Sequence, residues 1–99
     1  MVQKKYLRKG AECKVTFELP ADNGVQAVNV LGDFNNWEAD ALPMKLRKKD
    51  RVFTATANLP AGQVYQFRYL VDGEAWVTDQ EADGVQVGPY GETNSVVEV

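Results

Sequence analysis

The chain has no histidine and only one cysteine among its 99 residues. Without histidine it lacks the general base of a Ser-His-Asp catalytic triad. A single cysteine excludes an internal disulfide. Because Cys13 alternates with Val15 and Phe17, we expect it to be a buried apolar side chain rather than a reactive thiol.

The sequence also lacks a long apolar run and an excess of basic residues. No stretch approaches the ~20 apolar residues that a membrane-spanning helix needs. Residues 1–10 carry basic charge with no apolar segment behind them, which is not typical of a signal peptide. The formal net charge is −3, with both signs interspersed, whereas nucleic acid binding requires a concentrated cationic face. We therefore expect a cytoplasmic location and neither a membrane nor a nucleic-acid partner.

One local basic cluster flanks Asp50 at an expected hairpin tip. It consists of Lys45, Arg47, Lys48, Lys49 and Arg51. A short run of charge at a turn is typical of a solvated loop, and we interpret it so.

What the sequence does contain is an alternation of apolar and polar residues with period two. Turn signals recur about every ten residues, and no segment has a helical period of useful length. Strands are expected at residues 13–19, 25–31, 44–47, 52–59, 64–71, 76–78 and 95–99. Residues 84–91, rich in glycine, are expected to be irregular. This pattern predicts one all-β domain over residues 1–99, an immunoglobulin-like antiparallel β-sandwich of about seven strands.

Two tryptophans stand next to turns instead of within apolar strands. Trp37 ends the run Gly32-Asp33-Phe34-Asn35-Asn36-Trp37, whose Gly, Asp and Asn residues favour a turn. Trp76 follows a second turn at residues 71–74. The alternation places Arg68 and Trp76 opposite the core faces of their strands, so the two share one outer surface if the strands pair as a hairpin. Sugars bind to such sets because their C–H faces stack on flat rings and planar polar groups bond their hydroxyls.

Several motifs in a fixed order resemble a known family. They are residues 30–37, Met44, residues 59–62, residues 65–73, Trp76, Asp79 and residues 94–96. The pattern resembles the early-set carbohydrate-binding module at the N-terminus of isoamylases and glycogen-branching enzymes. It is similar to the glycogen-binding domain in the β-subunit of AMP-activated protein kinase. The resemblance covers the chain from about residue 13 to Val99 and implies an immunoglobulin-like (early-set) sandwich.

The resemblance also implies roles for individual residues. Trp37 and Trp76 would stack on glucose rings, and Arg68 and Asn94 would bond sugar hydroxyls. Tyr90 stands where an apolar side chain inserts among the glucose units. Three departures are visible: Arg68 replaces the usual lysine, the turn at residues 72–76 is one residue longer, and Glu92 replaces a threonine that contacts sugar.

The implied function is non-catalytic binding of α-1,4-glucan (glycogen, starch or maltodextrin), with no cofactor and with a glycogen-metabolising enzyme as a further partner. A glycosidase would need two carboxylates about 5 to 9.5 Å apart, and the sequence places none of its acids across a cleft. The candidate acids are Asp33, Asp40, Asp72, Asp79 and Glu81. Residues 79–84 echo the start of a calcium loop, but Tyr90 stands at its last ligand position, so we expect no metal. A protein-interaction module that uses the tryptophans as interface anchors remains the alternative.

Overall fold

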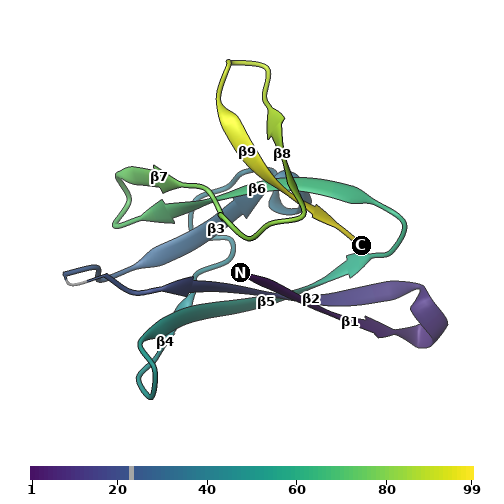
Figure 1. Ribbon diagram of the computed structural model, residues 1–99, viewed down its shortest axis with the longest axis horizontal. Helices are drawn as coiled ribbons and strands as arrows, with labels where there is room; N and C mark the ends of the chain where they lie inside the picture. Colours follow the sequence, from purple (N-terminus) through teal and green to yellow (C-terminus); the bar gives the residue numbers. More distant parts are fainter. Residues whose placement is uncertain (23) are drawn as a thin grey trace.

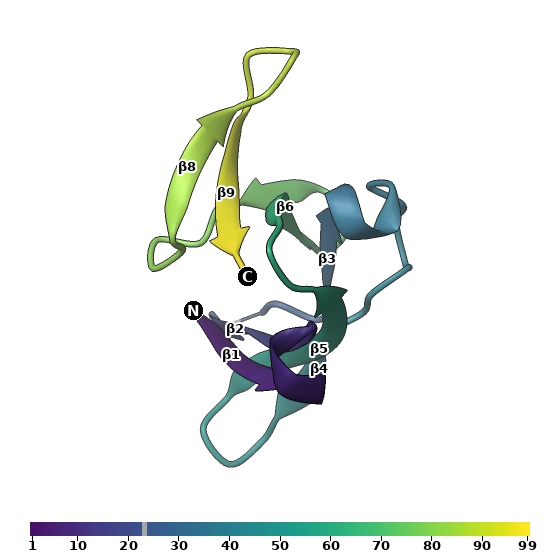
Figure 2. The ribbon, with the colours of Figure 1, turned by 90° about the vertical axis from the view of Figure 1, so that its right-hand side faces the viewer.

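The computed structural model describes residues 1–22 and 24–99, which form two antiparallel sheets packed face to face (Figures 1 and 2). The first sheet has the order β1-β2-β5-β4 and the second the order β3-β6-β9-β8, with β7 paired to β6. The first sheet comprises β1 (Val2–Leu7), β2 (Glu12–Pro20), β5 (Val52–Pro60) and β4 (Lys45–Arg47). The second comprises β3 (Val28–Gly32), β6 (Val64–Val71), β7 (Ala75–Val77), β8 (Gly84–Val87) and β9 (Thr93–Glu98). The predicted all-β sandwich is confirmed.

The described residues form nine strands instead of about seven, and the differences are local. The alternation of apolar and polar residues did not predict β1, which carries two adjacent lysines. The irregular structure expected for the glycine-rich residues 84–91 was wrong, because β8 pairs with β9 there. β3 starts at Val28 and not at Val25, because the N–H groups of Gln26 and Ala27 both bond the side chain of Asp72.

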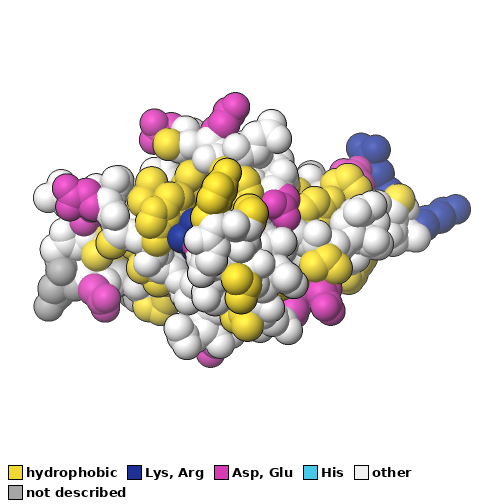
Figure 3. All heavy atoms as spheres, turned by 90° about the horizontal axis from the view of Figure 1, so that it is seen from above, with side chains coloured by type: hydrophobic (Ala, Val, Ile, Leu, Met, Phe, Trp, Pro, Cys, Tyr) yellow, Lys and Arg dark blue, Asp and Glu magenta, His cyan; other side chains and the backbone are white. Residues whose placement is uncertain are grey.

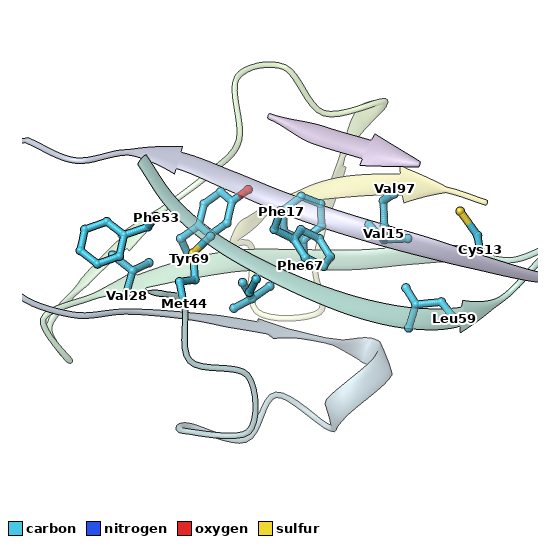
Figure 4. Packing of buried hydrophobic residues seen from close by; sticks show 12 residues of the cluster. Cys13, Val15, Phe17, Val28, Met44, Phe53, Leu59, Phe67, Tyr69 and Val97 are labelled. Atoms are coloured by element: carbon cyan, nitrogen blue, oxygen red, sulfur yellow. The ribbon is translucent and has the colours of Figure 1, made fainter. Parts of the chain in front are cut away.

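The core lies between the sheets and is built by the alternating residues of both (Figure 4). Phe67 packs edge-on against Phe17 at 4.9 Å and against Tyr69 at 5.6 Å between ring centroids. All three rings are fully buried. Cys13 is also fully buried and free, as its alternation predicted. The basic residues at positions 45–51 are exposed around the β4–β5 turn, which confirms the solvated loop.

A polar pair sits inside this apolar layer. The hydroxyl of Tyr69 donates a hydrogen bond of 2.7 Å to Asp79, whose backbone N–H in turn bonds the Oγ of Ser95 at 2.7 Å. Burial and the neighbouring Asp79 carboxylate both raise the pKa of Tyr69, because each disfavours the phenolate. The buried tyrosine therefore stays a neutral donor, and its polar atom is satisfied.

In residues 1–22 and 24–99, helical structure is confined to two single 3-10 turns, η1 (Arg8–Gly10) and η2 (Asp33–Asn35). Within the described part of the chain, no helix combines the length and apolar character needed to cross a bilayer.

At Gly32 the backbone of β3 lies close to β6. A Cβ at Gly32 would lie 2.6 Å from the carbonyl oxygen of Gln66 and 3.0 Å from the Cβ of Phe67. Contacts this short are not compatible with a side chain unless the backbone moves. The two strands can therefore pair in this register only because residue 32 has no side chain.

We expect Gly32→Ala to lower the free energy of unfolding by about 1–3 kcal/mol, because the added methyl must displace a backbone carbonyl. Urea denaturation measures this directly. Gly84→Ala is the matched control, since its Cβ meets nothing within 4 Å. Equal stabilities of the two variants would contradict the close approach of β3 to β6.

The carboxyl group of Asp83 makes the free energy of unfolding depend on pH. Burial raises the pKa of Asp83, but hydrogen bonds from Lys4 Nζ (2.6 Å) and from the N–H of Glu98 (2.7 Å) outweigh it, so the pKa lies below its ordinary value. A depressed carboxyl pKa stabilises the fold above the unfolded-state pKa of about 3.9, and this contribution is lost as pH falls through the folded-state pKa.

Asp83→Asn should accordingly lower the free energy of unfolding at pH 7 by about 0.2–1 kcal/mol, the usual range for a partly exposed pair. The difference from wild type should shrink to nothing by about pH 2. Glu81→Gln removes the same charge from an exposed side chain and should change stability less. A destabilisation by Asp83→Asn that is the same at both pH values would refute the linkage.

Candidate functional site

The turn between residues 32 and 37 is held rigidly by its own polar groups. The Oδ1 of Asn35 accepts a bond from the N–H of Gly32 (3.0 Å), and its Nδ2 donates to the carbonyl of Val30 (2.9 Å). The N–H of Trp37 closes the turn on the carbonyl of Gly32 at 3.0 Å. Asn36 and Trp37 both adopt left-handed backbone angles, with φ of 56° and 57°. Asn35 is therefore a structural brace, and the chain reverses so that Trp37 leaves the core.

Two side chains of the same turn fix its position on the sandwich. Phe34 points inward, with its ring 5.6 Å from Phe17 and 6.1 Å from Tyr65. Asp33 points the other way: it accepts the N–H of Gln66 at 2.9 Å and the indole Nε1–H of Trp37 at 3.1 Å. One carboxylate thus ties the Trp37 ring to β6.

The β6–β7 hairpin supplies the second indole and a cation on the outer face of the second sheet. Trp76 lies opposite Leu70, and Arg68 lies opposite Leu31 of β3. The Cζ of Arg68 is 4.2 Å from the centroid of the Trp76 ring and 5.7 Å from that of Trp37, so the guanidinium makes cation–π contacts with both indoles. Arg68, Trp76 and Trp37 therefore share one outer surface, as the alternation indicated for the first two.

The β8–β9 hairpin forms one wall beside these rings. Its tip is closed by bonds from Gly88 N–H to the Glu92 carbonyl (2.7 Å) and from Gly91 N–H to the Gly88 carbonyl (3.1 Å). The side chain of Glu92 folds back into the tip, where its Oε2 accepts the N–H of Tyr90 at 2.9 Å. A Cβ at Gly88 would collide with this carboxylate. Glu92 therefore shapes the tip that carries Tyr90, a residue that is 92% exposed.

Asn94 lies on β9 itself, whereas the resemblance placed it just before the last strand. Its residue surface is only 2% exposed, and its Nδ2 donates to the Oε1 of Gln66 at 2.9 Å. The Oδ1 of Asn94 and the Nε of Arg68 are both buried and have no hydrogen-bond partner among the described residues. A donor and an acceptor without partners in one site are unusual, because buried polar groups are normally paired.

These elements enclose an open groove of about 560 Å³. Its lining comprises Asp33, Trp37, Gln66, Arg68, Trp76, Pro89, Tyr90, Glu92 and Asn94. Figure 3 looks down on the face from which the β8–β9 hairpin rises and shows hydrophobic side chains gathered around a basic one. All five residues singled out from the sequence thus line one groove. Sequence reasoning missed Asp33 and Gln66 as groove residues, although Gln66 alternates with Arg68 on β6 and could have been found from that spacing.

Two of the three acids of residues 79–84 stabilise the fold. Asp79 accepts the Tyr69 hydroxyl, and Asp83 pairs with Lys4. Among the residues that the structure describes, no group of three or more Cys, Asp or Glu side chains is arranged to hold a metal ion.

Residues 12–99 match a protein-family model that is described as the glycogen recognition site of AMP-activated protein kinase. The matched segment begins with β2 and contains every residue that lines the groove.

We expect Asp33→Ala to release the Trp37 ring, because the variant removes the acceptor of the indole N–H and of the Gln66 N–H together. The free energy of unfolding should fall by about 1–3 kcal/mol, and the indole N–H of Trp37 should exchange faster with water in NMR spectra. Glu81→Ala provides a control at an exposed acid outside the groove. An unchanged Trp37 indole signal in Asp33→Ala would show that the carboxylate does not hold the ring.

Proposed function

Because this chain belongs to the family described as the glycogen recognition site of AMP-activated protein kinase, we propose that its groove binds α-1,4-glucan, as in glycogen, starch or maltodextrin. Carbohydrate-binding modules of this kind are non-catalytic, and we propose that this chain likewise binds glucan without cleaving it. One observation carries the proposal: two indoles flank a cation beside a buried hydrogen-bond acceptor that lacks a partner.

The indoles supply the apolar part of recognition. The guanidinium of Arg68 lies over the Trp76 ring, so a glucose unit would stack on the opposite face of that indole. Trp76 is 46% exposed, which leaves ring surface for such a contact. Trp37, held by Asp33, would take a neighbouring glucose. Stacking removes apolar surface from water on both partners and is therefore favourable.

The unpartnered polar atoms supply the specific part. Arg68 Nε is a donor and Asn94 Oδ1 is an acceptor, and a glucose hydroxyl both donates and accepts. A bound sugar would satisfy the two groups, which otherwise remain buried without a partner. Tyr90, at the exposed tip of the β8–β9 hairpin, would reach over the glucan chain. No cofactor has a role in this scheme.

The groove is open, so it covers only part of each glucose unit. We therefore propose a modest Kd of order 10⁻⁴ to 10⁻⁵ M, equivalent to about −5.5 to −7 kcal/mol. We further propose that the protein acts in the cytoplasm, with a glycogen-metabolising enzyme as a second partner.

Replacing both indoles tests whether glucan stacks on Trp37 and Trp76. Trp37→Ala with Trp76→Ala should weaken binding of maltoheptaose or β-cyclodextrin at least tenfold, a loss of about 1.4 kcal/mol or more, while the fold remains intact. Each indole alone should account for part of the loss. Co-sedimentation with glycogen and isothermal titration measure the effect.

Tyr6→Ala is the matched control, because Tyr6 is an exposed aromatic on β1, outside the groove. Full glycogen binding by the folded double variant would overturn the proposal that the two indoles bind glucan. The alternative, an interaction module with no glucan affinity of its own, predicts no heat of binding for wild type at millimolar maltoheptaose. It also predicts capture of a protein partner that maltodextrin does not displace.

A further inference from the structure

The two sheets have free strand edges, and most of them are blunted against pairing with another chain. The edge strand β1 carries Lys4 and Lys5, and β4 is three residues long with Lys45 and Arg47 at its ends. Short length and charge are the usual devices that keep an edge from recruiting another strand.

In the second sheet, two edges are also blunted. β3 is covered by residues 42–44, since the N–H of Val30 bonds the carbonyl of Leu42 and the N–H of Met44 bonds the carbonyl of Val28. β7 has only three residues. Neither offers a long open row of backbone groups.

The edge strand β8 is also short, at four residues, but unlike β1 and β4 it carries no charge. Its sequence is Gly-Val-Gln-Val, without charge and without proline. Val85 is 70% and Val87 64% exposed, which makes them among the most exposed apolar residues described. Figures 1 and 2 show that the β8–β9 hairpin projects beyond the two packed sheets, so its outer edge is open to an approaching chain.

The hydrogen-bond pattern shows which groups this edge presents. The N–H of Gly88 bonds the carbonyl of Glu92, and the register continues through Gln86 opposite Asn94. Hydrogen-bonded pairs alternate in an antiparallel ladder, so Gln86 bonds inward to β9. The N–H and C=O groups of Val85 and Val87 therefore point away from β9, toward the free edge.

We propose that a second copy of this chain pairs with this edge, β8 against β8, about a two-fold axis at Gln86. In that register Val85 of each copy lies opposite Val87 of the other, which gives four backbone hydrogen bonds between outward-pointing groups. The valines of both copies then lie on one face as cross-strand pairs, a favoured combination of β-branched residues. The edge is thus complementary to itself, as a two-fold interface requires.

The charges next to β8 fit the same arrangement. Asp83 would face Pro89 of the second copy, and Glu81 would face Gly91, so no acid meets an acid although the chain has a net charge of −3. Asp83 is moreover already paired with Lys4. The contact is short, so the dimer is weak and forms at about 10⁻⁴ M protein and above.

The dimer has a consequence that rests on the proposed function. A two-fold axis perpendicular to a continuous sheet places the same face of both copies on the same side. The two grooves, both on the outer face of the second sheet, would therefore open in one direction. Two modest sites on one glucan particle bind with greater avidity than either site alone.

A cysteine scan tests the register without any glucan, so its failure leaves the proposed glucan site untouched. In the proposed dimer the two Gln86 residues form a non-hydrogen-bonded pair with Cα atoms about 4.5 Å apart, within disulfide range. Gln86→Cys should give a covalent dimer under mild oxidation. Val85→Cys should give little, because each Val85 faces Val87. Cys13 does not interfere, because it is fully buried. Equal yields from both variants, or none from Gln86→Cys, would overturn the register.

Sedimentation of the chain from about 10 µM to about 1 mM tests the interface itself. The double variant Val85→Lys, Val87→Lys should weaken self-association at least about tenfold, because it places like charges on the edge. Val64→Lys is the control, since Val64 is 61% exposed on β6, away from β8. Wild type that stays monomeric at about 1 mM, or a double variant that associates like wild type, would refute the pairing of β8 with a second copy.

Discussion

The site depends on the close approach of β3 to β6 at Gly32. With no side chain at this position, the end of β3 lies directly against the backbone of Gln66 and the Cβ of Phe67. The turn that follows can then send Phe34 into the core and Asp33 onto the N–H of Gln66. As a result, Trp37 lies beside Arg68. The geometry of the outer face is therefore set by packing at the edge of the core.

The groove combines groups with satisfied and unsatisfied polar atoms. Three polar side chains hold the walls of the groove in place through hydrogen bonds to the backbone and to Trp37. They are Asp33, Asn35 and Glu92. Arg68 stacks between the indoles but keeps its Nε without a partner, and Asn94 bonds Gln66 through Nδ2 but leaves Oδ1 free. Such a site is organised before a ligand arrives, so little is lost in ordering it on binding. Glu92, which departs from the family pattern at a sugar contact, has a structural role in the hairpin tip.

Much of this was predictable because strand alternation is a strong signal. Period two placed Cys13 in the core and Arg68 and Trp76 on the outer face. The position of Trp37 was harder, because two consecutive left-handed residues and the bonds of Asn35 determine it, and neither follows from periodicity. The strand β8 was not predicted from the sequence. It has only four residues, one of them glycine, and so short an alternation cannot be distinguished from a loop. The role of Asp33 depends on its bond to Gln66 in a separate strand, and that of Glu92 on how its side chain folds back onto Tyr90 within the hairpin tip. A single sequence shows neither contact.

The glucan site between the two tryptophans is tested most directly by an NMR titration of the uniformly labelled chain with maltoheptaose. We expect chemical-shift changes to concentrate in the indole N–H signals of Trp37 and Trp76, the Nε–H of Arg68 and the Nδ2 signals of Asn94. They should saturate near 10⁻⁴ to 10⁻⁵ M ligand. Residues on the outer face of the first sheet, such as Thr16 and Thr56, should not move. Shifts confined to that opposite face, or a spectrum unchanged at millimolar maltoheptaose, would contradict a glucan site between the two tryptophans.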